Sequence, residues 1–231
     1  MKILPTLVGL MAISYFAACS DNGSNAETFN AAKVCPESGR GTFVDERDGQ
    51  EYRYTTIGNQ VWMAQNLNYA VTDKTLLYPL TGEQADVRFA CLYPDDNCME
   101  KGLVYKWLTA YYACPEGWHL PRFDEWQKMI DVLGGDEEGG FRLKASSGWA
   151  VLNPGDDANW NDECGFSALP SIAGELYDGL YANWWLSDYE PDDSEPIKVW
   201  VLNFDGYRNF YRFKYNPPDD DAFFSVRCIK N

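Results

Sequence analysis

The sequence predicts an α+β fold stapled by disulfides, and three observations support this prediction. Trp126, Met129, Ile130 and Leu133 recur at the spacing of one helix face. Short stretches with β-branched and aromatic residues, such as residues 51–57, are bounded by turn residues and are typical of strands. Six cysteines follow residue 19, an even number that favours disulfides in an exported chain.

The N-terminus predicts export and a lipid anchor. After Met1 and Lys2, residues 3–18 are mostly apolar, but this stretch is shorter than the roughly 20 residues that span a bilayer. Residues 1–18 are therefore interpreted as a signal peptide. The sequence FAAC ending at Cys19 resembles a bacterial lipobox, which would make Cys19 the acylated N-terminal residue. An ordinary signal peptide is the alternative.

A lipid at Cys19 would make the membrane a partner of the protein. Several acyl chains, at about 0.8 kcal/mol per buried methylene, give a stable anchor. The expected location is the bacterial cell envelope, as an outer-membrane or cell-surface lipoprotein. A net charge of −16 repels phosphate backbones and anionic headgroups, so no nucleic-acid partner is expected.

The remaining chain divides into a tether and one domain. Residues 20–33 are small and polar without periodicity, so residues 19–40 are predicted to be flexible. Residues 41–231 are rich in aromatic residues and glycine-punctuated turns. A single domain of that length buries roughly 70% of its unfolded surface.

Individual elements follow from local patterns. Helices are predicted over residues 105–112 and 123–133, the second ending at the Gly134-Gly135 pair. Strands are predicted over residues 42–45, 51–57, 60–63, 166–169, 183–187, 198–204, 207–213 and 223–229. Alternating apolar residues on both faces predict that residues 198–204 are buried on both sides. Long loops are expected at residues 134–159, 173–182 and 188–196.

Several segments resemble one known family. The sequence CPEGWHLPRFDEW at residues 114–126 is similar to the signature of the Fibrobacter succinogenes major paralogous domain (FISUMP), a family of unassigned function. Four further segments fit it in order: residues 48–69, 102–107, 165–170 and 223–231. Together they span about residues 41–231.

A fainter resemblance reaches the formylglycine-generating enzymes, through HLPRFDEW at residues 119–126 and SVRC at residues 225–228. Those enzymes have a C-type-lectin-like fold, so the resemblance implies that fold here: two main helices with mostly antiparallel strands, disulfide-stapled and loop-rich. Arg122 stands where both families usually have a small N-cap residue. Such a cap is worth about 1 kcal/mol, so a looser start of the helix is expected.

The cysteines are assigned to three pairs. Cys91 and Cys98 bracket a turn-rich hexapeptide and are expected to pair locally. The lectin-like resemblance implies a bond between a cysteine near the main helix and one in the last strand, which is Cys114–Cys228 here. Cys35 and Cys164 then remain as the third pair by elimination.

Candidate chemistry is sparse, so a non-enzyme is expected. His119 is the single histidine, which excludes a zinc site built from several histidines. It lies in the family's WHLP segment, which favours a hydrogen-bonded corner residue over a catalytic one. Asp156, Asp157 and Asp162 are a weak calcium candidate because they offer hard oxygen ligands, although a solvated acidic loop is favoured. No other cofactor is expected.

The tyrosines suggest a ligand face in the loops between residues 173 and 215. Tyr177, Tyr181, Tyr207 and Tyr211 lie there beside acids and amides, a composition that suits sugar or peptide binding. Half-buried packing is the alternative for each. The sequence therefore predicts a lipid-anchored extracytoplasmic binding or adhesion module, with a polysaccharide or surface protein as ligand. The alternatives are an enzyme of the formylglycine-generating type and a purely structural envelope protein.

Overall fold

The α+β prediction is confirmed by a computed structural model, which describes residues 29–71, 89–91, 98–150, 160–171, 179–190, 198–205, 210–215 and 222–231. The first of two sheets is antiparallel throughout. Its strands, in spatial order, are β1 (Gly41–Val44), β2 (Glu51–Ile57), β3 (Gln60–Met63), β11 (Ile229–Lys230) and β6 (Trp118–His119). Hairpin turns at Gly49 and Gly58, both at positive φ, connect the first three strands.

The second sheet is larger and is antiparallel except where β10 pairs with β7. Its order is β4 (Phe89–Ala90), β5 (Val104–Tyr105), β10 (Phe224–Ser225), β7 (Tyr181–Glu190), β8 (Lys198–Asp205) and β9 (Phe210–Tyr215). As predicted, β8 is largely buried on both faces.

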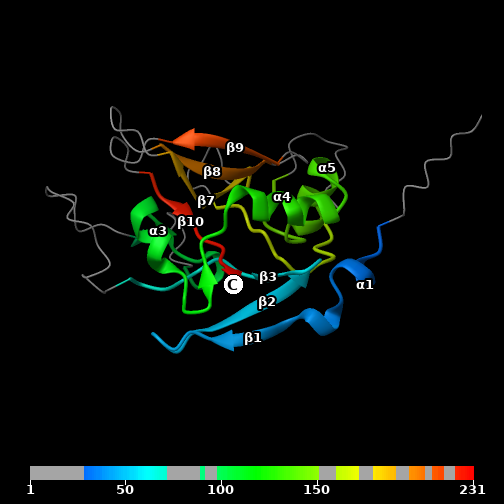
Figure 1. Ribbon diagram of the computed structural model, residues 1–231, viewed down its shortest axis with the longest axis horizontal. Coiled ribbons are helices and arrows are strands. Elements are labelled where there is room, and N and C mark those ends of the chain that lie inside the picture. The colour runs from blue at the N-terminus through cyan, green and yellow to red at the C-terminus, as the bar shows by residue number, and fades with distance from the viewer. Residues whose placement is uncertain are drawn as a thin grey trace, which may run out of the picture.

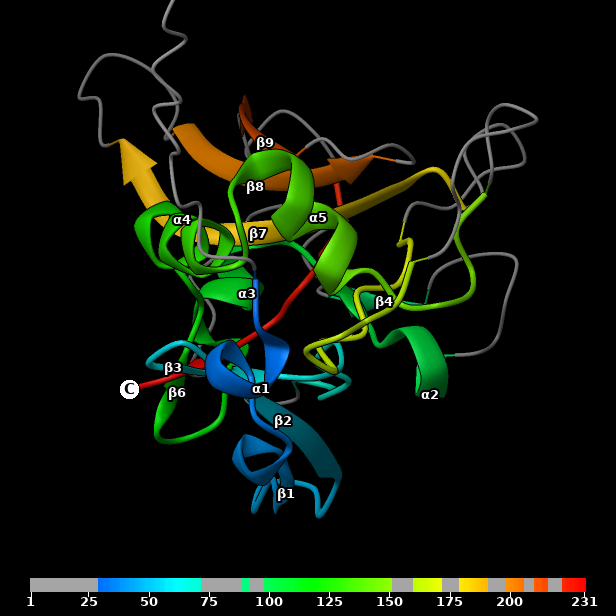
Figure 2. The same cartoon turned by 90° about the vertical axis from the view of Figure 1, so that its right-hand side faces the viewer.

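Helices lie beside and between the sheets. They are α1 (Ala31–Val34), the 3-10 turn η1 (Glu37–Gly39), α2 (Cys98–Lys101), α3 (Trp107–Ala113), α4 (Phe123–Val132) and α5 (Asp136–Leu143). In two perpendicular views β7–β9 lie in the upper part of the molecule and β1–β3 in the lower part, with α4 and α5 beside β7 (Figures 1 and 2). None of the helices in the described part of the chain is long and apolar enough to span a bilayer.

Trp126 of α4 joins the two sheets in the core. Its ring centroid lies 4.7 Å from that of Trp62 in β3 and 5.6 Å from that of Trp184 in β7. All three indoles are fully buried. Burying a large aromatic side chain contributes about 1.5–3 kcal/mol, so this stack is a major source of stability.

The start of α4 is held by a residue from another element, which corrects the expectation of a loose N-terminus. Arg122 has no small capping side chain, but the backbone amide of Phe123 donates to Asp188 Oδ2 at 2.6 Å. Glu125 Oε2 accepts from the Arg122 amide at 2.8 Å. The cap that the local sequence lacks is therefore supplied by β7.

Two helix predictions need correction. Residues 134–159 were expected to form a loop, but α5 occupies Asp136–Leu143. The absence of a side chain at Gly139 lets α5 pack closely against α4, because a Cβ at this position would lie only 2.8 Å from Ile130 Cδ1. The first helix begins at Trp107 rather than residue 105, since Tyr105 belongs to β5.

The later strands also differ from the prediction. The single strand expected at residues 223–229 is divided into β10 in one sheet and β11 in the other. Residues 166–169 form no strand and make only a bridge between Ala168 and Lys144. The strand expected at residues 207–213 is β9, which begins at Phe210, and β7 is longer than the predicted residues 183–187.

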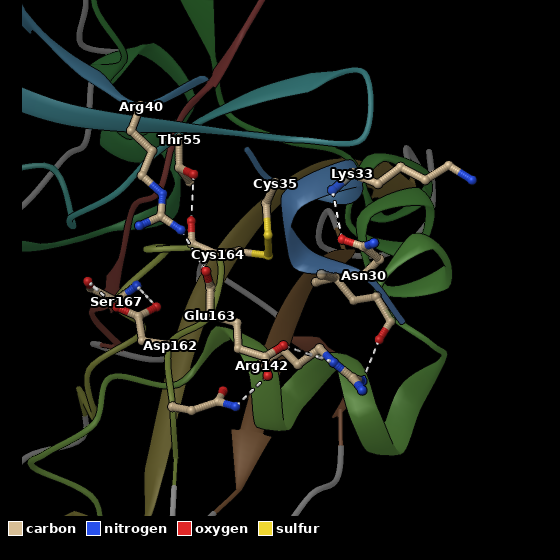
Figure 3. Close-up of a disulfide and its surroundings, with 12 residues drawn as sticks. Asn30, Lys33, Cys35, Arg40, Thr55, Arg142, Asp162, Glu163, Cys164 and Ser167 are labelled. Atoms are coloured by element: carbon tan, nitrogen blue, oxygen red, sulfur yellow. Dashed lines mark hydrogen bonds and ion pairs between the residues drawn. A yellow bond between two sulfur atoms is a disulfide. The ribbon is translucent and has the colours of Figure 1, made fainter. Parts of the chain in front are cut away.

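The described cysteines form the three expected pairs, Cys35–Cys164, Cys91–Cys98 and Cys114–Cys228. The first pair has a consequence for the tether, because Cys35 lies within its predicted range. Gly58 N donates to Val34 O. Arg40 donates to Glu163 O at 2.6 Å (Figure 3). Residues 29–40 thus belong to the folded domain, and the predicted boundary at residue 40 is too late.

Candidate ligand-binding face

Two of the four predicted ligand tyrosines lie together on one face of the second sheet. Tyr181 in β7 is opposite Asp205 in β8, and Tyr211 in β9 is opposite Asn203. Because side chains alternate along a strand, residues 203 and 205 point to the same face, and both tyrosines share it. Tyr211 is 44% exposed and Tyr181 is half-buried. Tyr177 and Tyr207 lie outside the described residues.

The floor of this face is polar and buried. Asn183, Asn203 and Asp205 are all less than one-tenth exposed. Asn203 Nδ2 donates to Asn183 Oδ1, and the backbone amide of Asn183 donates to Ser171 Oγ at 3.2 Å. Asn203 Oδ1 is buried and has no hydrogen-bond partner among the described residues. An unpaired buried acceptor costs about 1–3 kcal/mol, so a donor that reached it would be held favourably.

The electrostatics keep the exposed phenol neutral. Burial raises the pKa of Tyr211, and the Asp205 carboxylate and Tyr181 raise it further. Tyr211 therefore remains a hydrogen-bond donor at neutral pH. A face with neutral phenols, amides and one acid suits a hydroxyl-rich or cationic ligand better than an anionic one.

The calcium candidate is not assembled in the described residues. Both oxygens of Asp162 accept from Ser167, Oδ1 from the backbone amide at 2.8 Å and Oδ2 from the hydroxyl at 2.7 Å. Asp156 and Asp157 lie outside the described residues. No cluster of three or more metal-ligating side chains occurs within the part of the chain that the structure describes. The Asp162 carboxylate instead closes its own loop (Figure 3).

His119 has both ring nitrogens engaged, as expected of a corner residue. Nδ1 lies 2.6 Å from Asn231 Oδ1, and Nε2 lies 3.0 Å from Glu125 Oε1. A depression of about 270 Å³ adjoins this group, with Gln60, Lys128 and Lys230 in its lining. Its polar groups could bind a small polar molecule, but its lining contains neither a thiol nor a hydroxyl nucleophile.

The thiol chemistry of a formylglycine-generating enzyme would require reduced cysteines. Every cysteine within the described ranges is disulfide-bonded, whereas Cys19 lies outside them. These six sulfurs therefore act as covalent staples in this structure.

Sequence reasoning missed a buried cation at the centre of the fold. Arg227 is 1% exposed and donates to Asn66 Oδ1 and to the carbonyl of Phe166, each at 2.6 Å. Trp184 Nε1 donates to the same Asn66 oxygen at 2.9 Å. Burial lowers the pKa of Arg227 to about 9, and Asp162 partly offsets this shift. The signal available in sequence was an arginine inside an otherwise apolar stretch.

Sequence reasoning also missed an exposed group of aromatic residues. Tyr111 and Tyr112, in the helix predicted over residues 105–112, are 37% and 48% exposed. The helix buries Trp107, Thr109, Ala110 and Ala113 instead.

Comparison with known proteins identifies one family. The model of the Fibrobacter succinogenes major domain matches residues 55–230, well over half of the 231 residues. No curated protein and no solved structure matches the chain. The matched range includes both sheets' central strands, the Arg227 network and the face formed by Tyr181 and Tyr211.

Proposed function

This chain belongs to the Fibrobacter succinogenes major domain family, and on that premise we propose that it is a non-catalytic binding or adhesion module of the bacterial envelope. The family match supports a surface or extracellular module, without defining its activity. The disulfides support the same setting, because such bonds persist in oxidising compartments outside the cytoplasm.

The proposed attachment to the membrane is a lipid on Cys19, for which the FAAC sequence is the support. Metabolic labelling with an alkyne fatty acid should tag the wild-type protein, and Cys19→Ser should lose the tag. A matched variant, Ser20→Ala, should keep it. Label retained by Cys19→Ser would refute this attachment.

A C-type-lectin-like fold is also part of the proposal. The Cys114–Cys228 bond joins the segment before α4 to the end of the chain, as the resemblance to that fold implies. The two sheets, which are antiparallel except where β10 pairs with β7, and the central α4 are compatible with it. An experimental structure superposed on lectin-like domains would test this assignment, and a different strand order would reject it.

The observation that carries the binding proposal is the position of Tyr181 and Tyr211 above a buried polar floor. Aromatic rings beside hydrogen-bonding groups are typical of the centre of binding surfaces. The proposed ligand is a polysaccharide or a surface protein with hydroxyl-rich or cationic contacts.

Binding of the purified protein to a glycan array and to detergent-solubilised envelope proteins would test this face. Tyr181→Ala and Tyr211→Ala should each weaken the binding about tenfold or more, with little change in melting temperature. Val44→Ala, at an exposed position of β1, is the control. Normal binding by both tyrosine variants, or unfolding of both, would place the ligand elsewhere.

A further inference from the structure

The molecule carries a second exposed aromatic surface, on α3 and the end of β7. Six large hydrophobic side chains are exposed among the described residues, and three of them gather here. Tyr111 and Tyr112 come from α3 and are 37% and 48% exposed, and Tyr189 comes from β7 and is 50% exposed. We call Tyr111, Tyr112, Tyr189 and the buried Trp107 the aromatic platform.

The rings of the platform are in contact. The ring centroid of Trp107 lies 5.5 Å from that of Tyr111 and 6.2 Å from that of Tyr189. The rings of Tyr111 and Tyr112 are 5.1 Å apart. Trp107 is 8% exposed and therefore supports Tyr111 and Tyr189 from below, while Tyr112 packs against Tyr111. The three exposed rings thus form a connected surface rather than scattered side chains.

The platform is fixed to the fold at two points. Trp107 Nε1 donates to the carbonyl of Leu186 in β7 at 2.9 Å, which fixes the supporting ring. The pairing of β7 with β8 is irregular between Trp185 and Tyr189, and such a bulge redirects the side chains that follow it. Rings held in place before binding lose little conformational freedom when a ligand arrives.

The net charge of the chain disfavours anions at the platform. Asp188 and Glu190 flank Tyr189 in the sequence, but side chains alternate along a strand, so these two acids point away from the face of Tyr189. Glu190 is paired with Lys214 at 2.9 Å. The chain as a whole carries a net charge of −16. The platform therefore suits an uncharged ligand and repels acidic polymers and anionic headgroups.

The size of the platform favours a polysaccharide over a protein as its ligand. A tyrosine buries about 150–250 Å² in total, so three half-exposed rings offer roughly 200–350 Å². A stable protein interface needs about 800 Å² from each partner. No exposed large aliphatic side chain adjoins these rings in the described residues. Stacked sugar rings, by contrast, need only an aromatic surface with hydroxyl groups at its edge.

We propose that the aromatic platform of Trp107, Tyr111, Tyr112 and Tyr189 binds a neutral polysaccharide chain by stacking. The site lies outside the face of Tyr181 and Tyr211 and does not depend on it. Figure 1 shows α3 and α1 on opposite sides of the view along the long axis, so the helix that carries Tyr111 and Tyr112 is separated from α1.

Affinity electrophoresis of the purified protein tests the proposal. Native gels would contain dextran, mannan, galactan, xylan or mixed-linkage β-glucan as neutral polymers, and alginate or polygalacturonate as anionic ones. Retardation is expected in at least one neutral gel and in neither anionic gel. Tyr112→Ala and Tyr189→Ala should each weaken the retardation about tenfold, whereas Tyr189→Phe should retain most of it. Val44→Ala should migrate as the wild type does.

The same variants distinguish binding at the aromatic platform from binding at the face of Tyr181 and Tyr211. Loss of retardation in Tyr211→Ala, with normal behaviour of Tyr112→Ala and Tyr189→Ala, would overturn the platform while supporting the face of Tyr181 and Tyr211. No retardation in any neutral gel would overturn the platform as well. Self-association in sedimentation velocity that disappears in Tyr112→Ala would identify a second copy of the chain as the occupant and would also reject a polysaccharide.

Discussion

Asp188, near the end of β7, accepts a hydrogen bond from the backbone amide of Phe123 at the start of α4, with 2.6 Å between the two atoms. The residues are 65 positions apart, so the cap joins the second sheet to the central helix. A helix N-terminus carries unpaired amides and a partial positive charge. The Asp188 carboxylate accepts a hydrogen bond from one of these amides, and its negative charge is attracted to the partial positive charge.

Asp188→Ala should lower the free energy of unfolding by about 1–2 kcal/mol, the usual cost of losing an N-cap. Asp188→Asn keeps an acceptor oxygen and should lose about half as much or less. Urea denaturation followed by tryptophan fluorescence measures both. Equal losses in the two variants would mean that the hydrogen bond contributes little.

Asp162 should make stability depend on pH in an unusual direction. Burial raises its pKa above the ordinary value of 3.8, although two hydrogen bonds from Ser167 oppose the shift. At a pH between the pKa of Asp162 in the unfolded chain and its raised pKa in the folded chain, the unfolded chain has lost the proton that the folded chain still holds. The contribution of Asp162 to stability therefore falls as the pH rises through this interval.

Asp162→Asn removes that titration and keeps the loop. Asparagine tolerates the positive φ of 45°. Its Oδ1 can accept from the Ser167 amide as Asp162 does, while its Nδ2 can donate to the Ser167 hydroxyl oxygen in place of the bond that Asp162 Oδ2 accepts. The stability of this variant relative to wild type should increase from pH 3.5 to pH 6.5, as urea denaturation at both values would show. A relative decrease would indicate that the Ser167 donors lower the pKa instead.

Gly102 and Gly117 form a matched test of close packing. Both have positive φ, 78° and 81°. A Cβ at Gly102 would lie 2.7 Å from Asn66 Cβ and 2.8 Å from the Leu67 carbonyl oxygen, whereas a Cβ at Gly117 would meet nothing. Gly117→Ala should cost about 1 kcal/mol for the backbone conformation alone.

Gly102→Ala should cost about 2 kcal/mol more than Gly117→Ala, because the methyl group displaces Asn66, which accepts from Arg227 and Trp184. Thermal unfolding of the two variants measures the difference. Equal melting temperatures would show that the Asn66 network shifts without cost.

Removal of the Cys35–Cys164 bond should destabilise the domain more than removal of the Cys91–Cys98 bond, because it closes a much longer loop. The loop-entropy relation gives about 5 kcal/mol for its separation of 129 residues and about 2 kcal/mol for the separation of 7 between Cys91 and Cys98. Double alanine variants of each pair can be compared by denaturation. Protease cleavage within residues 29–40 should appear only in the first variant.

The sequence predicted best where local signals agreed with the tertiary structure. The strands β2 and β3 have the expected bounds, and α4 begins at the expected Phe123. In these segments periodicity, turn residues and burial all point the same way. The three cysteine pairs also match, although one rested on a family resemblance and another on elimination.

Other elements depended on contacts that the sequence does not display. The glycines of α5 indicate a loop locally, but Gly139 permits the close approach of Ile130. Residues 223–229 look like one strand, yet Arg227 is buried between two strands of different sheets. In each case a partner distant in sequence decided the outcome.

The Cys35–Cys164 bond also determines how mechanical force would enter the domain. A pull on an anchor at Cys19 would travel along the chain to Cys35 and pass through the covalent bond to Cys164, which is fully buried. The carbonyl of Cys164 accepts from Thr55 Oγ1 at 2.6 Å, at the middle of β2 (Figure 3). Tension would thus load the interior directly, and the edge strand β1 would not be peeled from its sheet under drag.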